Sequence, residues 1–308
     1  MKLSLVDMHC DTVYEAYKNG CDLVTNNLSV SADKATEYEK YTQIMAIWSD
    51  KKLFDDEAFE QFCKIAEFLY TQCSSYKNVY GLNKQIHINS FKSDITFIPA
   101  VEDARILAGK EERFEVLIQY GVKILTLMWS GCSCIGGAYD TDASLTQFGE
   151  IVVSKCFESG IIPDISHASD RSAERVFELN TENRPVIASH SNSRTVFPHK
   201  RNLSDSLFYK IKNCNGLVGL NLFCEHLGEP PYENMIIKHI DHWLSIGGEN
   251  NICLGCDFDG ARTPDEYRNI RDLSHLADQL AKMNYSQKLI EKLFWRNAEN
   301  FIKANIII

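Results

Sequence analysis

Short runs of apolar residues alternate along the chain with longer stretches in which apolar residues recur every three or four positions. Runs of roughly four to eight apolar residues, bounded by polar ones, are typical of buried β-strands. Eight such runs predict strands: Leu3–Met8, Gln43–Trp48, Ile95–Val101, Val122–Met128, Ile161–Ile165, Pro185–Ala188, Leu217–Leu222 and Ile252–Gly255. The amphipathic stretches predict helices: Asp55–Tyr76, Asp103–Tyr120, Ser144–Ser159, Asp170–Leu179, Ser204–Asn213, Tyr232–Ile246, Asp272–Met283 and Ser286–Ala304.

Strands that alternate with helices over the whole chain predict an α/β fold with a parallel sheet. Eight strands favour a single (β/α)8 TIM barrel over residues 1–308, because no Pro-rich linker or shift in composition divides the chain. The alternative is a doubly wound open sheet, which usually has a glycine-rich phosphate loop after an early strand. Here His9, Cys10 and Asp11 follow the first strand instead. We expect the long first connection, Val13–Tyr41, to cover the mouth of the barrel.

Two neighbouring predicted strands, Ile161–Ile165 and Pro185–Ala188, are each followed by a Ser-His pair. The helical stretch between them begins at the capping signal of Ser169. Barrel enzymes place their chemistry at the carboxyl ends of the strands. We therefore expect His167 and His190 to lie at the same edge, as half of a metal site.

Three other strands also end in polar residues that could bind a metal ion. His9 and Asp11 are two positions apart, so on an extended strand end both side chains point the same way and Cys10 points elsewhere. Glu102 follows the third strand and Asp257 the last. Taken singly, each residue also fits an ordinary role, such as a hydrogen-bonded core pair, a helix cap or a turn.

Together, three histidines and two carboxylates at one end of a barrel match the ligand set of a two-metal hydrolase: His9, Asp11, Glu102, His167 and His190. A carboxylate between two ions roughly 3.5–4 Å apart would let them share a hydroxide nucleophile and polarise a carbonyl. In many barrel hydrolases a carbamylated lysine from the fourth strand makes this bridge. That strand ends here in Met128 and Trp129, so Glu102 is the candidate bridge.

Six motifs, in order along the chain, resemble those of the membrane (renal) dipeptidase family, the M19 zinc peptidases: DMHCDT, IPAVEDA, DISHAS, PVIASHSNSR, HKRNLSD and GCDFDG. The match runs from residue 7 to about residue 260, and each motif is short but their joint occurrence is specific. The tail LFWRNAENFIK resembles the closing Gly-x-Asn motif only faintly, because Asn297 is kept and the glycine is lost.

The resemblance implies a (β/α)8 barrel that holds two Zn²⁺ ions per chain, with Co²⁺ or Mn²⁺ as alternative ions. It implies that His9 and Asp11 hold one ion, that His167 and His190 hold the other, and that Glu102 bridges both. Members of the family are commonly homodimers.

The resemblance also implies which residues bind the substrate. Arg201 would bind the substrate carboxylate through its planar guanidinium. Asp257 would take a proton from the bridging water and deliver it to the departing amine. Trp129 stands where eukaryotic members have a histidine that contacts the substrate, and an indole can donate one hydrogen bond but cannot carry a proton. His199 and His226 are weaker candidates for that missing role.

Overall composition limits the partners and the location of the protein. The net charge of −10 and the pI near 5.4 argue against nucleic acid and anionic membranes as main partners. No apolar run approaches the roughly 18–20 residues that span a bilayer. The first residues, MKLSLVDMHCD, lack the features of a secretory signal, so we expect a cytoplasmic protein.

The remaining cysteines and histidines predict little chemistry. The eleven cysteines do not form the pair of Cys-x-x-Cys motifs that is typical of a structural zinc site. They are expected to be reduced thiols, Cys132-x-Cys134 included. His239 and His242, at helical spacing, are predicted to be a solvated pair on the outer ring of helices. His87 and His275 lie in polar surroundings with no partner pattern.

Three hypotheses follow for the function. The first is a zinc dipeptidase that cleaves dipeptides with free ends, and that tolerates a D-residue at the carboxyl side as the family does. The second is a hydrolase of cyclic amides, lactones or β-lactams with the same metal site. The third is a barrel without turnover that acts as a binding protein. The two Ser-His pairs do not indicate a serine nucleophile, because no Gly-x-Ser-x-Gly elbow is present.

Overall fold

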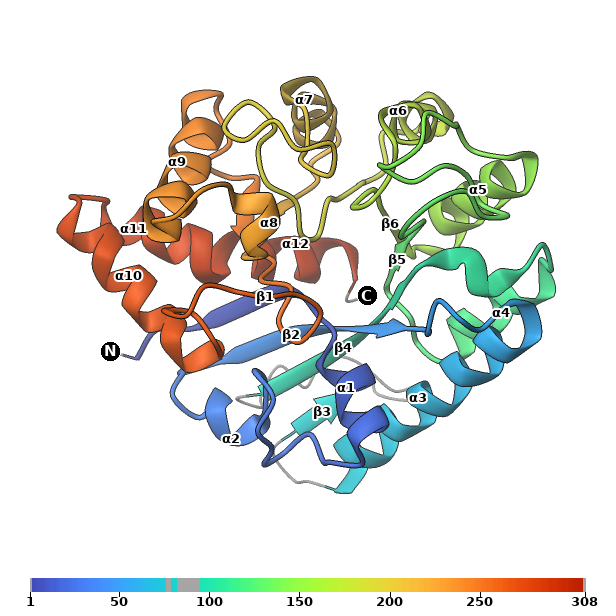
Figure 1. Ribbon diagram of the computed structural model, residues 1–308, viewed down its shortest axis with the longest axis horizontal. Coiled ribbons are helices and arrows are strands. Elements are labelled where there is room, and N and C mark those ends of the chain that lie inside the picture. The colour runs from blue at the N-terminus through green and yellow to red at the C-terminus, as the bar shows by residue number, and fades with distance from the viewer. Residues whose placement is uncertain (1, 76–78, 82–94, 307–308) are drawn as a thin grey trace.

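A parallel sheet of eight strands forms the middle of the molecule in the computed structural model, which describes residues 2–75, 79–81 and 95–306 (Figure 1). The strands are β1 Leu5–Cys10, β2 Tyr41–Trp48, β3 Val79–Gly81, β4 Ile95–Glu102, β5 Ile124–Thr126, β6 Ile162–Asp164, β7 Val218–Leu220 and β8 Ile252–Leu254. They are hydrogen-bonded in the order β6-β5-β4-β2-β1-β8-β7, and β3 pairs with β4. The sequence did not predict β3.

The sheet closes through residues 185–188, which the sequence predicted as a strand. Two isolated parallel bridges, Asp164↔Ile187 and Ala188↔Val218, join this segment to β6 on one side and to β7 on the other. The backbone N–H of Ala188 donates to the carbonyl of Leu217 at 2.9 Å. The segment is shorter than a full strand, yet it completes a closed parallel sheet. The fold is therefore the predicted α/β barrel and not the open, doubly wound sheet.

Helices surround the sheet (Figure 1). They are α1 Thr12–Asn19, α2 Ala32–Ala35, α3 Asp55–Ser75, α4 Glu112–Gln119, α5 Gln147–Ser159, α6 Asp170–Leu179, α7 Asp205–Asn213, α8 Cys224–Leu227, α9 Tyr232–Ser245, α10 Leu273–Lys282, α11 Gln287–Glu291 and α12 Asn297–Asn305. Hydroxyl side chains begin several of them by accepting a hydrogen bond from a backbone N–H three residues on: Thr146, Ser169, Ser204 and Ser286. A π-helical turn, Lys292–Arg296, joins α11 to α12.

The single helix predicted over Asp103–Tyr120 is wrong. The structure has a short 3-10 helix, Ala104–Leu107, and then α4. Ala108 and Gly109, with φ of 50° and 74°, lie in the left-handed region, which a right-handed helix cannot pass through. Asp103 caps the 3-10 turn by accepting a hydrogen bond from the N–H of Arg105 at 3.2 Å. The apolar residues of this stretch have helical spacing, but that spacing does not indicate the break between the two helices.

The interior of the barrel is apolar over most of its length. One buried cluster takes residues from the barrel strands and from α12: Val6, Met8, Ile44, Ile98, Ala100, Ile124, Ile162, Ile187, Leu217, Cys253, Ala298, Phe301, Ile302 and Ile306. Burying a large apolar side chain contributes about 1.5–3 kcal/mol to folding. The polar side chains that could carry chemistry are thus left at the carboxyl ends of the strands.

Part of the first connection, which was predicted to cover the mouth of the barrel, lies beside those carboxyl ends. Asp259, after β8, accepts hydrogen bonds from the hydroxyl of Thr12 and, at 2.8 Å, from the N–H of Ser29. These contacts tie Thr12, just before the connection, and Ser29, in its middle, to the loop after the last strand. Tyr14 and Glu15 of α1 line the cavity that opens there.

Candidate metal centre

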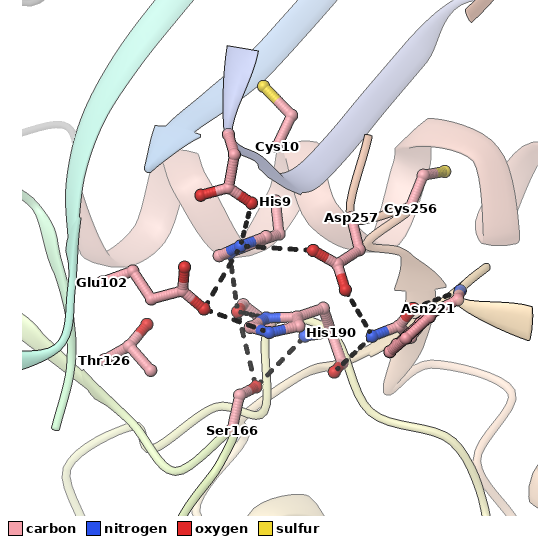
Figure 2. Close-up of polar contacts among 12 residues, drawn as sticks. His9, Cys10, Glu102, Thr126, Ser166, His190, Asn221, Cys256 and Asp257 are labelled. Carbon is pink, nitrogen blue, oxygen red and sulfur yellow. Dashed lines mark hydrogen bonds and ion pairs between the residues drawn. The ribbon is translucent and has the colours of Figure 1, made fainter. Parts of the chain in front are cut away.

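Five side chains predicted as metal ligands come together at the carboxyl ends of the strands. Figure 2 shows His9, Glu102 and His190 among them. The Oε1 atom of Glu102 lies 3.7 Å from Nε2 of His9, 3.1 Å from Nε2 of His167 and 3.5 Å from Nε2 of His190. The Oδ2 atom of Asp11 lies 3.6 Å from Nε2 of His9. Residues up to 181 positions apart in the sequence thus face one another around Glu102.

The potential ligand atoms form three overlapping groups: His9, Asp11 and Glu102; Glu102, His167 and His190; and His9, His190 and Asp257. Within each group the atoms lie within 4.8 Å of one another. Glu102 belongs to the first two groups. The geometry therefore offers two neighbouring cation positions that share one carboxylate.

Hydrogen bonds at the far side of each ring fix the protonation of His167 and His190. The Nδ1 of His167 lies 3.0 Å from the carbonyl oxygen of Trp129, which can only accept, so Nδ1 carries the proton. Ser189 donates its hydroxyl proton to Asp164, so the Ser189 oxygen accepts from Nδ1 of His190 at 2.7 Å. In both rings Nε2 is left with a lone pair that points into the cluster.

This donor set fits divalent cations. The Nε2 atoms of His167 and His190 lie 3.0 Å apart, and two lone pairs at that distance repel unless a cation lies between or beside them. The Nε2 of His9 is buried and has no hydrogen-bond partner. Imidazole nitrogens together with carboxylate oxygens are the ligands that Zn²⁺ and similar ions prefer.

Burial and mutual charge shift the pKa values of these groups. Burial, reinforced by the charge of Arg201, holds the pKa of His167 well below its usual range, so this imidazole is neutral. Burial also favours the neutral form of His9, but Glu102 and Asp11 outweigh it and raise the pKa of His9 to about 10. Burial and the charge of Asp11 raise the pKa of Glu102 well above its ordinary value. A buried cluster this acidic is stabilised by positive charge.

The turn after β8 is shaped by close contact with Asp11. A Cβ atom on Gly260 would lie 1.9 Å from Oδ2 of Asp11, so only glycine fits while that carboxylate keeps its place. Asp257 adopts a positive φ of 64°, which costs free energy in a residue other than glycine and is common at functional sites. Its Oδ2 accepts a hydrogen bond from Asn221 at 3.0 Å, and its Oδ1 lies 3.9 Å from Nε2 of His9.

Neighbouring cysteines take no part in the cluster. Cys10 and Cys256 point away from the histidines (Figure 2). The Sγ of Cys10 lies 3.5 Å from the sulfur of Met45. All eleven cysteines of the chain are free, as predicted.

A cavity of about 280 Å³ opens above the cluster. Five of the predicted site residues line it: Asp11, Glu102, Trp129, His167 and Asp257. Arg201 is only 4% exposed and is not among the residues that line the cavity. Its guanidinium donates to the hydroxyl of Ser191 at 2.9 Å and to the carbonyl of His190 at 3.0 Å, and its Nε has no partner.

The predicted solvated pair on α9 is wrong. His239 is fully buried: its Nδ1 accepts from the N–H of Ser193 at 3.1 Å, and its Nε2 donates to the carbonyl of Leu227 at 3.0 Å. His242 is partly buried and contacts the carboxylate of Asp205 at 2.8 Å. His239 lies on the inner face of α9, and the signal was the buried apolar residues three or four positions away, such as Ile236.

The sequence also gave no indication of the hydrogen-bond network beneath the histidines. Asp164, at the end of β6, is fully buried and accepts from the N–H groups of Ser166 and Ser189 and from the hydroxyl of Thr126. A carboxylate inside the apolar run Ile161–Ile165 was the available signal.

His275 is exposed, and His87 lies outside the described residues.

A family model for membrane dipeptidases, peptidase family M19, matches residues 1–305. The chain belongs to this family. Curated relatives include a Klebsiella pneumoniae protein from the pqqA 5′ region, 28% identical over 217 residues, or 66% of this chain and 79% of that protein. Human dipeptidase 3 is 25% identical over 306 residues, or 93% of this chain and 62% of its own length. The M19 chain thus spans about three-fifths of the length of that relative.

Solved structures of metallopeptidases share the fold of this M19 chain. The dipeptidase AC, a metallopeptidase of family M19, superposes with a TM-score of 0.91 at 21% identity over the full length of both chains. A metallopeptidase from Rhodobacter sphaeroides, liganded with a phosphinate mimic of the dipeptide L-Ala-D-Ala, gives 0.88 at 20% identity, covering 99% of this chain and 100% of that one. Among the described residues, no helix combines the length and apolar character that crossing a bilayer requires.

Proposed function

We propose that this M19 chain is a zinc-dependent dipeptidase that hydrolyses the peptide bond of dipeptides with free ends, including those with a D-residue at the carboxyl end. The observation that carries the proposal is the buried cluster in which His9, His167 and His190 turn their Nε2 atoms toward Glu102, beneath a cavity. The dipeptide mimic bound to the Rhodobacter sphaeroides relative supports the substrate class.

In this proposal His9 and Asp11 would hold one zinc ion, His167 and His190 would hold the other, and Glu102 would serve both. Co²⁺ or Mn²⁺ fit the same ligand set. When bound, the ions supply an activated water and polarise the scissile carbonyl. The network of Asp164 and Ser189 holds the ring of His190 in the tautomer that a ligand requires.

Residues around the cluster handle the substrate and its protons. Asp257 faces the cluster with Oδ1 while Asn221 holds Oδ2, so it is placed to accept a proton and return it to the leaving amine. Arg201 supplies the positive charge that a substrate carboxylate needs. Trp129 forms part of the wall against which the substrate packs. Cytoplasmic location and assembly as a homodimer complete the proposal.

Metal analysis together with dipeptide assays on wild type and Glu102→Ala tests the proposal. We expect about two ions per wild-type chain, and in the variant the loss of at least one ion and of all turnover. Glu112→Ala, on the exposed face of α4, is the matched control and should change neither quantity. A variant that keeps both ions and full turnover would contradict the role of Glu102.

A substrate panel separates the dipeptidase from the alternatives. L-Ala-L-Ala and L-Ala-D-Ala are compared with lactones, cyclic amides and β-lactams. Hydrolysis confined to the last three classes would replace the dipeptidase by a different metal hydrolase. Well under one ion per chain, with no hydrolysis after zinc is added, would instead indicate a binding protein.

A further inference from the structure

Two histidines of the cavity wall, His199 and His226, lie outside all three groups of candidate ligands. His226, on the short helix α8, lines the cavity and is 7% exposed. Its Nδ1 is buried and has no hydrogen-bond partner. A buried polar atom without a partner costs free energy, so it is uncommon unless a ligand or water completes it.

The surroundings of His226 favour an anion. Arg201 is close enough for its charge, added to the effect of burial, to lower the pKa of His226 to about 2, so the ring is neutral and has one N–H to donate. The Nε of Arg201 is also buried without a partner. The ring of His199 lies 4.9 Å from that of His226. His226 on the cavity wall and Arg201, whose charge acts on it, thus each keep one polar nitrogen without a partner.

Two hydrogen bonds hold His226 in place. Asn202, which follows Arg201 in the chain, donates its side-chain N–H to the carbonyl of His226 at 2.9 Å. His239 donates to the next carbonyl, that of Leu227, at 3.0 Å. The loop that carries Arg201 and the helix that carries His226 are thus fixed to each other. A binding group held by such contacts loses little entropy when a ligand arrives.

We propose that His226 is a specificity-determining residue that binds the carboxylate of the dipeptide together with Arg201. The inference rests on the proposed dipeptidase function and names the end of the site that recognises the substrate's charge. In the described structure the Asp and Glu side chains that line the cavity are Asp11, Glu15, Glu102, Glu225, Asp257 and Asp259, and no Lys or Arg lines it. Acidic side chains repel a carboxylate, so the charge of Arg201 behind His226 is what draws the carboxylate to this residue.

The position of His226 also sets the direction of the substrate. α8 follows β7, and in the closed sheet β7 lies across from β4, whose neighbours are β2 and β5. Trp48 ends β2 and Trp129 follows β5, and their rings lie 5.3 Å apart on the cavity wall. A dipeptide with its carboxylate at His226 therefore places its amino-terminal residue against these two indoles.

Steady-state kinetics on His226→Phe and His226→Gln test the inference, with a dipeptide and the matching dipeptide amide as substrates. Phenylalanine keeps the ring but removes the N–H, whereas glutamine keeps an N–H donor. A hydrogen bond to a charged group is worth about tenfold or more in affinity. We expect His226→Phe to raise KM for the free dipeptide about tenfold, with kcat within about threefold. KM for the amide should not change, and His226→Gln should recover most of the affinity.

Controls separate carboxylate binding from a change in shape. Metal content should be unchanged in both variants, and His275→Phe, at an exposed position of α10, should behave as wild type. An equal rise in KM for dipeptide and amide, or no rise at all, would overturn the inference while the dipeptidase function stands.

Calorimetric titration with a phosphinate dipeptide mimic distinguishes the two proposals. If wild type binds the mimic but hydrolyses no dipeptide, and His226→Phe weakens binding, the inference stands and the proposed function fails. If wild type neither binds nor hydrolyses, both fail.

Discussion

The Nε2 atoms of His167 and His190 lie 3.0 Å apart although the other nitrogen of each ring holds the proton. The arrangement places two lone pairs face to face, and Oε1 of Glu102 lies 3.1 Å from Nε2 of His167. Side chains that only filled the barrel would turn donors toward acceptors. The hydrogen bonds behind each ring, rather than contacts between the rings, therefore impose this geometry.

Ser189 is the residue through which that geometry can be tested. Ser189→Ala removes the oxygen that accepts from Nδ1 of His190 and leaves the ring free to change tautomer. Loss of such a supporting hydrogen bond typically costs about 10–100-fold in metal affinity. We expect a loss of this size for Ser189→Ala, measured by competition with a chelator.

The matched control for Ser189 is Ser154→Ala on the exposed face of α5, where the hydroxyl donates to the carbonyl of Glu150. It should bind metal as wild type does. Wild-type affinity in Ser189→Ala would show that the hydroxyl does not determine the state of His190.

Gly260 provides a second test, which acts through Asp11. Gly260→Ala would place a Cβ 1.9 Å from Oδ2 of Asp11, so the carboxylate must move away from His9. We expect the variant to fold, to lose at least one ion and to lose nearly all activity. Elemental analysis measures the metal content, and circular dichroism measures whether the variant folds.

Gly109→Ala is the control for Gly260→Ala, because it changes a glycine that has no contact with the metal ligands. Gly109 has a φ of 74° and no atom within 4 Å of an added Cβ, so the substitution strains the backbone without touching the cluster. It should lower the free energy of unfolding by about 1 kcal/mol and leave metal content unchanged. Full metal content in Gly260→Ala would mean that Asp11 can be displaced without consequence.

The sequence predicted the fold well because local patterns and tertiary structure agree in most elements. The helix predicted over Asp170–Leu179 has the same bounds in α6, since Ser169 caps its start. The candidate ligands were found because each one follows an apolar strand, and strand ends share one edge of a barrel. The segment Pro185–Ala188 was found by its apolar character even though it makes only isolated bridges.

The features that escaped prediction depend on contacts between distant segments. In the sequence Asp164 is a single polar residue in an apolar run. Its structural role comes from the hydrogen bonds that it accepts from Ser189 and Thr126, 25 and 38 positions away. His226 became a candidate for carboxylate binding only when the loop of Arg201 was placed beside α8. Spacing along one helix could not show such partners.

Trp129 allows a prediction that separates backbone from side chain. The group that holds His167 is the carbonyl of Trp129, so Trp129→Ala should keep its metal ions. The indole packs against Trp48 on the cavity wall, and losing this surface removes about 1.5–3 kcal/mol of apolar contact for a large substrate side chain. We expect kcat/KM to fall about tenfold or more for dipeptides with an amino-terminal Phe, and little for those with Gly. Loss of metal would show that the side chain itself positions His167.

His239 predicts how stability depends on pH. Burial lowers the pKa of His239 to about 4, from an ordinary value of 6.5. Between these values the unfolded chain binds a proton that the folded chain does not, so stability falls as pH falls through this range. A difference of about 2.5 pH units corresponds to about 3 kcal/mol at the acid end.

His239→Gln removes this contribution along with the hydrogen bonds to Ser193 and Leu227. The variant should be less stable than wild type near pH 7, by about 1–3 kcal/mol for each buried group left without a partner. That deficit should shrink as pH falls from 6.5 toward 4, because only wild type loses the stability linked to this imidazole. Urea unfolding at a series of pH values measures it, and His275→Gln serves as the control. A deficit that stays constant with pH would contradict the prediction, because it would mean that His239 has the same pKa in the folded and unfolded chains.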